Sequence, residues 1–437
     1  MNFPESEAYL YSLGNEVSAM KLGLGNIRKL LNALGDPQQN YLKVQIAGTN
    51  GKGSVCAFLD SICNTAGIKT GTFTSPHLIS ITERIRINGR DIGEEAFANH
   101  ATRVGKTAER LLASGKLEYR PTFFEQITAI ALVAFADAGV EVAILETGLG
   151  GRSDATTAAN AEIAAITRID LDHQEYLGET IEEIAAEKAA IIMDQTTCVV
   201  IGAQTESVIR LLKERCHEVG VVPFSEQGYS AWSVIGGEGD LVNINLTLGV
   251  YPQVELGLKG RHQIENAHTA IQLAQALIYH FVIFPPDDDE EYYVIEGLRR
   301  ARHSGRLESD GLYLFDGAHN VGGAKALAEY LTEFEKRSIT LFFGSMRDKN
   351  VAEILNILAP LAERIILTEP ANSRAFSCED LLSYLPATIS RRQTFATDTV
   401  ANAIEIAETV TSGDGIILVT GSLYLVGEVK KILQSQI

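Results

Sequence analysis

Lys52 lies between two glycines in the stretch Gly48-Thr-Asn-Gly-Lys-Gly-Ser54, where a lysine has no packing purpose. The glycines allow a tight loop whose backbone N–H groups converge, as in loops that bind phosphates between a strand and a helix. The stretch departs from the common pattern G-x-x-x-x-G-K-[ST], because Ile46 replaces the first glycine and Gly53 follows the lysine. A glycine-rich turn can also be simple punctuation after a strand. The position of Lys52 favours a phosphate site.

Further polar side chains follow predicted strands or lie in a predicted helix. They are Glu146 after Val140–Leu145, Asp170 to His173 after Ile163–Thr167, Ser75 and His77 after Thr70–Thr74, and Lys188 in a helix that Thr180 and Glu183 begin with a capping box. Ligands of α/β sheets bind at the carboxyl ends of strands. A carboxylate there, beside a phosphate loop, is typical of a Mg²⁺ site. From these residues alone, a solvated glutamate, a structural histidine and a solvated lysine remain alternatives.

The elements that must position these residues alternate between strands and helices. Val44–Ala47 reads as the end of a buried strand, and apolar residues from Val55 to Ala66 recur at helical spacing up to Gly67. Further strands are predicted at Thr70–Thr74, Val140–Leu145, Ile163–Thr167 and Thr197–Ile201. Such alternation predicts a mostly parallel sheet covered on both faces. Within residues 241–258, Leu241–Leu248 and then Val254–Leu256 instead alternate apolar and polar side chains, which predicts an antiparallel pair of strands in a small separate sheet.

The length of 437 residues predicts two domains. The acidic run Pro285–Glu291 is predicted to be a surface connection, followed by a helical stretch. We place the boundary near Ser304-Gly305, which gives domains 1–304 and 305–437. A second α/β series then begins, with strands predicted at Leu312–Phe315, Ile339–Phe343, Ile365–Thr368 and Ile416–Thr420.

The composition excludes several classes of protein. A net charge of −19 argues against general binding to nucleic acid or to acidic membranes. Five cysteines without C-x-x-C spacing indicate reduced, mostly buried thiols in a cytoplasmic protein. We recognise no signal peptide or transmembrane helix.

Taken together, the motifs form an ordered set that resembles the folylpolyglutamate synthase/dihydrofolate synthase family, a branch of the Mur ligase superfamily. The similarity runs almost from end to end. It is carried by Leu22-Gly-Leu24, Gly48-Thr-Asn-Gly-Lys-Gly-Ser54, Thr74-Ser-Pro-His-Leu78, Thr122-Phe-Phe-Glu125, Glu146-Thr-Gly-Leu-Gly-Gly-Arg152 with Asp154, Leu171-Asp-His173, Glu187-Lys188, Gly260-Arg-His-Gln263 with Asn266, Gly305-Arg306, Asp316-Gly-Ala-His-Asn320, Asp348-Lys349 and Gly421-Ser-Leu-Tyr424. The resemblance implies a P-loop-type parallel sheet domain with a small antiparallel sheet, followed by a C-terminal Rossmann-like α/β domain.

The resemblance also implies roles for particular residues. The ATP site would comprise Asn50, Gly51, Lys52, Gly53, Ser54, Asn266, Arg306 and Asp316. Magnesium would be held by Ser75, Glu146 and His173. The pterin substrate would contact Leu22, Gly23, Leu24, Thr122, Phe123, Phe124, Glu125, Gly151, Arg152 and Ser153. The residues implied in catalysis are Lys52, Lys188, Asp316, His319 and Ser422, with Lys188 carbamylated and His319 and Ser422 near the glutamate or the reacting carboxylate.

The implied activity is ATP-dependent addition of L-glutamate to the carboxylate of folate or dihydropteroate through an acyl phosphate. A second metal ion and a monovalent cation are compatible with such a site, and we expect a monomer. The sequence leaves open whether one or both substrates are used, the preferred glutamate chain length and the state of Lys188. Ser304, Val321 and Ala190 depart from the family pattern. Arg168 and Asp170 are also unusual for it and receive no role.

Two alternative functions remain. Another Mur-type ligase would join an amino acid to a cell-wall precursor, but the Thr122–Glu125 motif argues against the nucleotide-sugar pocket that it needs. A P-loop ATPase or kinase module would turn over ATP without glutamate and would leave the part around Asp316–Asn320 unexplained.

Overall fold

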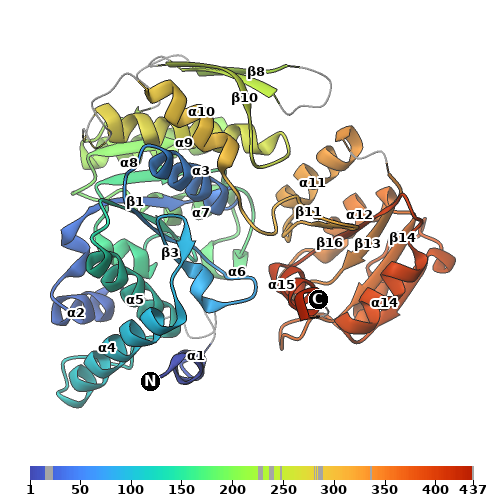
Figure 1. The fold of residues 1–437 in the computed structure, drawn as a ribbon, viewed down its shortest axis with the longest axis horizontal. Coiled ribbons are helices and arrows are strands. Elements are labelled where there is room, and N and C mark those ends of the chain that lie inside the picture. Colours follow the sequence, from blue (N-terminus) through green and yellow to red (C-terminus); the bar gives the residue numbers. More distant parts are fainter. Residues whose placement is uncertain are drawn as a thin grey trace.

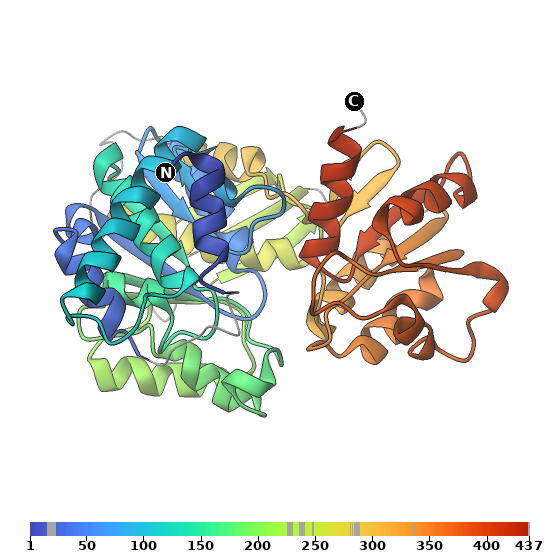
Figure 2. The same ribbon diagram turned by 90° about the horizontal axis from the view of Figure 1, so that it is seen from below.

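The computed structural model describes residues 1–14, 23–224, 230–235, 241–246, 249–279, 281, 283, 289–334 and 337–435. In Figures 1 and 2 these residues form two bodies side by side, one built from the chain up to α10 (Glu290–Arg300) and one from the chain after it. The predicted boundary at Ser304-Gly305 lies between α10 and the first strand of the second body, β11 (Glu308–Asp310). The exact domain bounds stay a prediction.

A seven-stranded sheet forms the centre of the N-terminal body, in the order β4-β3-β2-β5-β1-β6-β7. The strands are β1 (Leu42–Ala47), β2 (Thr70–Phe73), β3 (Ile85–Ile87), β4 (Arg90–Asp91), β5 (Val142–Glu146), β6 (Ile163–Ile166) and β7 (Cys198–Ile201). The five strands from β2 to β7 in this order pair in parallel, and β3 and β4 add an antiparallel edge. The five predicted strands are therefore confirmed, whereas β3 and β4 were not predicted.

Helices cover both faces of this sheet, as the alternation predicted. They are α1 (Phe3–Tyr11), α2 (Gly25–Ala33), α3 (Lys52–Thr65), α4 (Glu94–Ala113), α5 (Phe123–Ala138), α6 (Gln174–Leu177), α7 (Ile181–Ala189), α8 (Glu206–Val219), α9 (His262–Tyr279) and α10. Val44 and Ile46 of β1 pack toward α3, α9 and α10. Ala143 and Leu145 of β5 pack toward α1, α2, α4 and α5 on the other face, where α7 and α8 cover β6 and β7.

The helix predicted after the phosphate loop is α3. It begins at Lys52, is capped at its C-terminal end by Ala66, and is followed by Gly67 with φ of +78°. Its buried residues include Val55, Phe58, Leu59 and Ile62, which were predicted to form its apolar face. The tightly packed α3 therefore fixes the position of the loop that precedes it.

The small antiparallel sheet predicted at 241–258 is confirmed, with one more strand than expected. It consists of β8 (Ser230–Ile235), β9 (Leu241–Leu246) and β10 (Gly249–Glu255), in the order β10-β9-β8. Val242, Ile244 and Tyr251 belong to the hydrophobic cluster around α9 and α10. In the upper part of Figure 1 the small sheet lies beside these two helices.

The acidic run Pro285–Glu291 lies mostly outside the described residues. Its end departs from the prediction, because Glu290 and Glu291 form the first turn of α10 instead of a connection. Acidic side chains there complement the positive end of the helix dipole.

The C-terminal body contains a six-stranded sheet in the order β11-β12-β16-β13-β14-β15. Its strands after β11 are β12 (Tyr313–Phe315), β13 (Ile339–Phe343), β14 (Arg364–Thr368), β15 (Thr394–Thr397) and β16 (Ile416–Thr420). Its helices are α11 (Val321–Phe334), α12 (Val351–Leu358), α13 (Cys378–Ser383), α14 (Val400–Val410) and α15 (Leu423–Ser435). The first three helices cover one face and the last two the other. The four predicted strands are confirmed, and β11 and β15 were not predicted.

The two bodies touch through α15, which faces the N-terminal body in both Figure 1 and Figure 2. A Cβ built on Gly427 would lie 2.0 Å from the backbone oxygen of Leu78, so the helix and the loop after β2 are in close contact. All five cysteines are buried and free, as predicted. No helix among the described residues has both the length and the apolar character needed to span a membrane.

Candidate active site between the two bodies

The loop between β1 and α3 is closely packed on two sides. Thr49 N and Asn50 N donate to the backbone oxygen of Arg168, at 2.9 and 3.0 Å. A Cβ on Gly48 would lie 1.9 Å from Thr167 Oγ1, and a Cβ on Gly51 would lie 2.2 Å from Asn266 Oδ1. Both glycines also have positive φ, +152° and +90°. Glycine is therefore required at these two positions for both steric and conformational reasons.

Two lysines converge on this loop. Lys52 Nζ donates to the backbone oxygens of Gly48 and Thr49, at 3.1 and 3.3 Å, and Lys188 Nζ donates to the oxygen of Gly48 at 2.8 Å. Lys188 is buried, and burial together with the positive charge of Lys52 lowers the pKa of Lys188 to about 7. Lys188 is thus not the solvated helix lysine of the alternative interpretation.

Glu146 and Ser75 lie together at the ends of neighbouring strands. Ser75 N donates to Glu146 Oε2 at 3.1 Å, and a Cβ built on Gly53 would come within 3.5 Å of the same oxygen. Burial raises the pKa of Glu146, while the charge of Lys52 opposes that rise. The strand-end carboxylate is therefore buried beside the loop, and is not a solvated side chain.

His173 is turned toward the C-terminal body. Its Nε2 lies 3.3 Å from Lys349 Nζ, and its Nδ1 lies 3.9 Å from Asp348 Oδ2. Burial lowers the pKa of His173 to about 4. Across the described ranges, no three or more His, Cys, Asp and Glu side chains are grouped in a way that could hold a metal ion.

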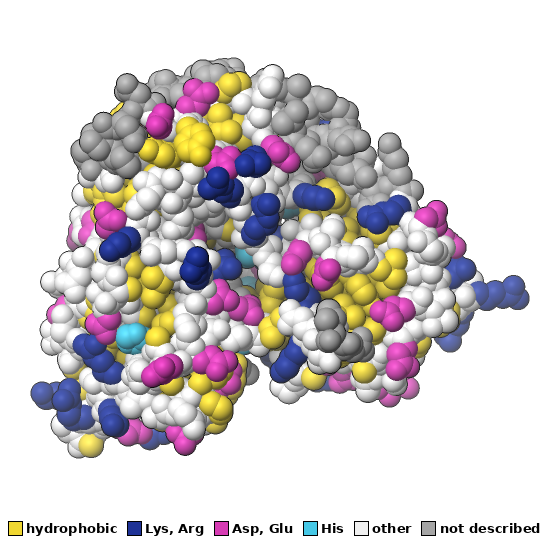
Figure 3. All heavy atoms as spheres, viewed as in Figure 1, with side chains coloured by type: hydrophobic (Ala, Val, Ile, Leu, Met, Phe, Trp, Pro, Cys, Tyr) yellow, Lys and Arg dark blue, Asp and Glu magenta, His cyan; other side chains and the backbone are white. Residues whose placement is uncertain are grey.

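A cavity of about 930 Å³ extends from the loop to the C-terminal body. Figure 3 shows the surface hollowed between the two bodies. The cavity is lined by these residues with an implied role: Gly23, Leu24, Asn50, Gly51, Lys52, Gly53, Ser54, Ser75, Thr122, Phe124, Glu125, Glu146, Ser153, His173, Lys188, Asn266, Arg306, Asp316, His319 and Ser422. Leu22 lies outside the described residues.

Three other residues implied in substrate binding do not line this cavity: Phe123, Gly151 and Arg152. Phe123 stacks on Tyr11, with ring centroids 5.9 Å apart, and Arg84 lies over its ring. Arg152 Nε contacts Glu187 Oε1 at 2.7 Å, and the Arg152 side chain is 60% exposed. In this structure these three residues lie outside the lining of the cavity.

The Thr122–Glu125 motif also has a structural explanation. Glu125 N donates to Thr122 Oγ1 at 3.2 Å, and Thr122 N donates to Glu125 Oε2 at 2.8 Å, which forms a capping box at the start of α5. The capping fixes Phe124 beside the cavity, where its ring prevents any side chain at Gly148.

In the C-terminal body, Asp316 follows β12 and is held by backbone donors. Leu307 N and Ala318 N donate to its two carboxylate oxygens, at 3.1 and 2.9 Å. Burial raises the pKa of Asp316, and the charge of Arg306 acts against that shift. Ser422 Oγ accepts from Tyr424 N at 3.1 Å at the start of α15.

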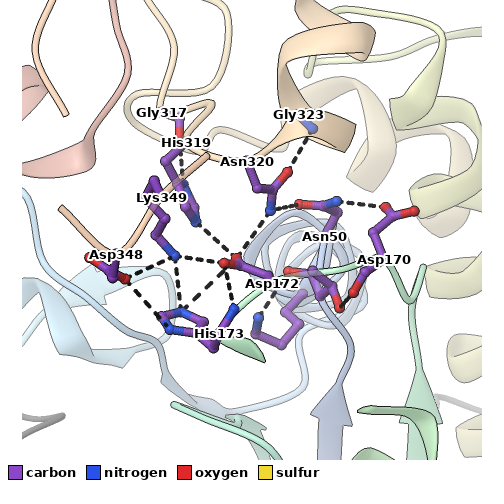
Figure 4. A network of polar contacts seen from close by, with 12 residues as sticks. Asn50, Asp170, Asp172, His173, Gly317, His319, Asn320, Gly323, Asp348 and Lys349 are labelled. Atoms are coloured by element: carbon purple, nitrogen blue, oxygen red, sulfur yellow. Dashed lines mark hydrogen bonds and ion pairs between the residues drawn. The ribbon is translucent and has the colours of Figure 1, made fainter. Parts of the chain in front are cut away.

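A polar network joins the two bodies at the cavity, as Figure 4 shows. Asp172 accepts from Lys349 Nζ at 2.7 Å and from Asn320 Nδ2 at 3.2 Å, and it lies 3.6 Å from His319 Nε2. Burial alone would raise the pKa of Asp172, but His319 and Lys349 together hold it well below its usual value. Asp172 is thus the centre of the contact between the bodies.

Sequence reasoning assigned no role to Asp172, Asn320, Lys349 or Arg374, although all four line the cavity. The first three belong to quoted motifs, so their position in a motif was a usable signal. Arg374 lies over the ring of Tyr424, with 5.8 Å from its Cζ to the centroid, and no motif marked it.

Comparison with known proteins gives a consistent result. The family model described as Mur ligase middle domain matches residues 46–274, and the model described as Mur ligase, glutamate ligase domain matches residues 300–423. A Bacillus subtilis protein named dihydrofolate synthase/folylpolyglutamate synthase is 34% identical over 431 residues, covering 95% of this chain and 96% of that protein. The chain spans about half the length of the bifunctional folylpolyglutamate synthase/dihydropteroate synthases that it matches in Haloferax volcanii and Halobacterium salinarum.

Solved structures agree over the whole chain. Mycobacterium tuberculosis folylpolyglutamate synthase complexed with ADP has a TM-score of 0.88 and 31% identity, covering 98% of each chain. A bifunctional folylpolyglutamate synthase/dihydrofolate synthase with Mn, AMPPNP and L-glutamate bound has a TM-score of 0.82 and 26% identity, covering 99% of this chain and 98% of that one.

The packing around the loop predicts that Gly51→Ala destabilises the protein more than Gly67→Ala does. Both glycines have positive φ, but a Cβ on Gly67 meets nothing within 4 Å, whereas one on Gly51 meets Asn266. Gly67→Ala should lower the free energy of unfolding by about 1–2 kcal/mol, the cost of a left-handed backbone. Gly51→Ala should cost more, because the Asn266 side chain must also move away. Urea unfolding of both variants checks this, and equal losses would contradict the close packing.

Proposed function

Because the chain belongs to the folylpolyglutamate synthase/dihydrofolate synthase family of Mur ligases, we propose that it joins L-glutamate to a folate or dihydropteroate carboxylate with the energy of ATP. The observation that carries this proposal is that the phosphate loop of one body and Asp316, His319 and Ser422 of the other line the same cavity. A ligase of this kind must bring three reactants into one enclosed space.

The reaction proceeds in two displacements. An oxygen of the substrate carboxylate attacks the γ-phosphorus of ATP, the bond to the bridging oxygen breaks, and ADP leaves an acyl phosphate. The α-amine of glutamate then attacks the acyl carbon, the carbon–oxygen bond to phosphate breaks, and the amine loses a proton. Activation is needed because a carboxylate is a poor electrophile. Water would hydrolyse the acyl phosphate, so the two bodies must enclose it.

The nucleotide phosphates would lie on residues 50–54. Lys52 Nζ donates to backbone oxygens of its own loop, so a phosphate can replace them as its partner. There the ammonium stabilises the negative charge of the transferring phosphoryl group. Asn266, Arg306 and Asp316 complete the nucleotide site from both sides of the cavity.

A divalent metal, which we propose to be Mg²⁺, fits the oxygen donors at the ends of β2 and β5. Glu146 and Ser75 offer a buried carboxylate and a hydroxyl beside the loop, and Mg²⁺ prefers oxygen ligands. His173 lines the same cavity but is engaged by Lys349, so it must turn from Lys349 to reach a metal. When bound, the metal neutralises charge on the phosphates.

The pterin substrate would occupy the apolar side of the cavity, near Leu24 and Phe124. Glutamate would bind near His319 and Ser422. The structure suggests Arg374 and Lys349 as additional partners for its carboxylates, since both are basic and line the cavity. Basic side chains on the cavity wall, such as Lys52 and Arg306, provide local positive sites through which a protein of net charge −19 can bind anionic substrates. We further propose that the protein acts as a monomer in the cytoplasm, without nucleic acid or membrane partners.

The decisive experiment is product analysis of the purified protein with ATP and L-glutamate, using dihydropteroate and tetrahydrofolate side by side. Glutamate-dependent ADP release with a product one glutamate heavier is expected for at least one substrate. ADP release independent of glutamate would favour a P-loop ATPase or kinase module. Glutamate addition only to a cell-wall precursor would favour another Mur-type ligase. Product formation from both substrates would identify a bifunctional enzyme.

We predict that Lys52→Ala lowers kcat by about 10²–10³, as removal of a donor to transition-state charge does elsewhere. The fold should persist, because the Lys52 ammonium donates to backbone oxygens of its own loop, and water can replace the ammonium as the donor to these oxygens. Steady-state kinetics and circular dichroism check both points. Lys106→Ala, at an exposed position in α4, is the control. Activity within a few-fold of the wild type would refute the role of Lys52.

We also predict that Lys188 takes up CO₂ in a pH-dependent way. Only the neutral amine reacts, forming an N–C bond and releasing a proton. With a pKa of about 7, Lys188 is mostly protonated at pH 6 and mostly neutral at pH 8. The carbamate signal from ¹³C-bicarbonate, measured by NMR, should therefore rise between these values and be absent in Lys188→Ala.

Lys52→Ala provides the sharper control for this prediction. The charge of Lys52 lowers the pKa of Lys188, so its removal should move the midpoint of CO₂ uptake to higher pH. A short carboxylic acid should restore part of the activity of Lys188→Ala by occupying the vacated space. An unmodified ammonium in the CO₂-equilibrated protein, with Lys188→Ala fully active, would disprove the proposal.

A further inference from the structure

The segment Arg168–Asp170, which follows β6, forms hydrogen bonds to the phosphate loop. Its backbone does most of this, because the oxygen of Arg168 accepts from Thr49 N and Asn50 N. Thr49 Oγ1 also donates to the backbone oxygen of Asp170 at 3.0 Å. These contacts need no particular side chain at 168 or 170. They therefore do not explain why an aspartate occupies position 170.

The side chain of Asp170 has a different partner. Asn50 Nδ2 donates to Asp170 Oδ2 at 2.7 Å. An aspartate carboxylate only accepts hydrogen bonds, so it selects one of the two orientations of the Asn50 amide. The amide nitrogen must point to Asp170, and the amide oxygen points away from it. Arg168 adds only a weak contact, with its Nε 3.6 Å from Asp170 Oδ1 and its side chain 43% exposed.

The selected orientation presents the Asn50 oxygen to the C-terminal body. Asn320 Nδ2 donates to Asn50 Oδ1 at 3.0 Å, and Gly323 N at the start of α11 donates to Asn320 Oδ1 at 2.8 Å. Figure 4 shows Asn50 between Asp170 and Asn320, with Gly323 beyond. The four groups form one directed chain of hydrogen bonds from β6 to a helix of the other body.

Gly322, in the first turn of α11, has no room for a side chain next to Asp170 and Asn50. A Cβ built on Gly322 would lie 2.8 Å from Asp170 Oδ2 and 2.9 Å from Asn50 Nδ2. The first turn of α11 therefore approaches both residues directly. A carboxylate at this position also faces the positive end of the helix dipole.

We propose that Asp170 is a positioning residue, which orients the Asn50 amide so that the phosphate loop engages the start of α11 when the two bodies close. This inference rests on the proposed function, in which closure protects an acyl phosphate. It makes the loop that holds the nucleotide and the contact that seals the cavity parts of one hydrogen-bonded unit. Asp170 acts through Asn50 and touches no substrate in this scheme.

The first test compares Asp170→Ala with Asp170→Asn in the whole protein. Asp170→Ala should lower kcat by about 10-fold, the effect expected for loss of a hydrogen bond to a charged group. The dissociation constant of ADP, measured without the other substrates, should change by less than about twofold, because the backbone still holds the loop. Asp170→Asn should restore most of kcat, since an amide oxygen can also accept from Asn50. Asp194→Ala, at an exposed position before β7, is the control.

The second test measures closure without turnover. Fluorescence energy transfer between labels on the two bodies, with a non-hydrolysable ATP analogue bound, should report fewer closed molecules for Asp170→Ala than for the wild type. If the wild type lacks glutamate-dependent turnover, the proposed function fails, and this measurement alone then decides the role of Asp170. Unchanged kcat and closure would overturn the inference. So would a loss of kcat matched by an equal loss of ADP affinity, or Asp170→Asn being as impaired as Asp170→Ala.

Gly322→Ala provides an independent variant that should fold well, since alanine is favoured over glycine in a helix. Its methyl group should obstruct closure and lower kcat by itself. Because the methyl group would meet the Asp170 carboxylate, the loss should be smaller when Asp170→Ala is already present. Equal losses in both backgrounds would overturn the proposed contact.

Discussion

The register of the parallel sheet determines the geometry of the whole cavity. β1 pairs on one side with β5, placing Ile46 opposite Glu146, and on the other with β6, placing Ala47 opposite Ile166. The phosphate loop, the buried carboxylate and the segment that supports the loop therefore leave the sheet at the same level. A slip of one residue would turn each side chain to the opposite face. Gln45 secures the register, because its Nε2 donates to the buried hydroxyls of Thr156 and Thr157 at 2.9 and 2.8 Å.

Charge within this frame is arranged for an anion. Lys52 and Lys188 both donate to the backbone oxygen of Gly48, so two ammonium groups share one acceptor. Their repulsion adds to burial in lowering the pKa of Lys188. Glu146 lies nearby with a pKa raised by burial. An anion with a bound metal would reduce the repulsion between the two lysines, because the anion pairs with both. The metal would also stabilise the charged form of the buried Glu146. The cavity is thus more favourable electrostatically with such ligands than without them.

How far the sequence predicted this arrangement depends on the element concerned. Most strands predicted for the two larger sheets were recognisable because they are short runs of mainly apolar residues. β4 and β15 carry no such signal, since β4 has two exposed residues and β15 is only partly buried. Glu146 and Ser75 could be placed because each directly follows a predicted strand. Phe123 and Arg152 belong to motifs yet do not line the cavity, because helix packing and an ion pair with Glu187 decide their direction. Contacts such as Asp172 with Lys349 depend on how two bodies meet, which no local pattern encodes.

The contacts between the two bodies are apolar near the chain connection and polar at the cavity. Near the chain connection, Leu78 packs against the cluster that contains Val426, and Gly427 allows the backbone of Leu78 to approach α15. At the cavity the contacts are polar and centre on Asp172 and Asn50. Separating an apolar contact exposes apolar surface to water, which costs free energy in proportion to the area exposed. Polar groups that separate form hydrogen bonds to water instead, so the net change in free energy is small. The apolar contact should therefore persist as a pivot while the polar contacts open and close. A ligand that touches both bodies needs only a modest difference in affinity to shift such an equilibrium.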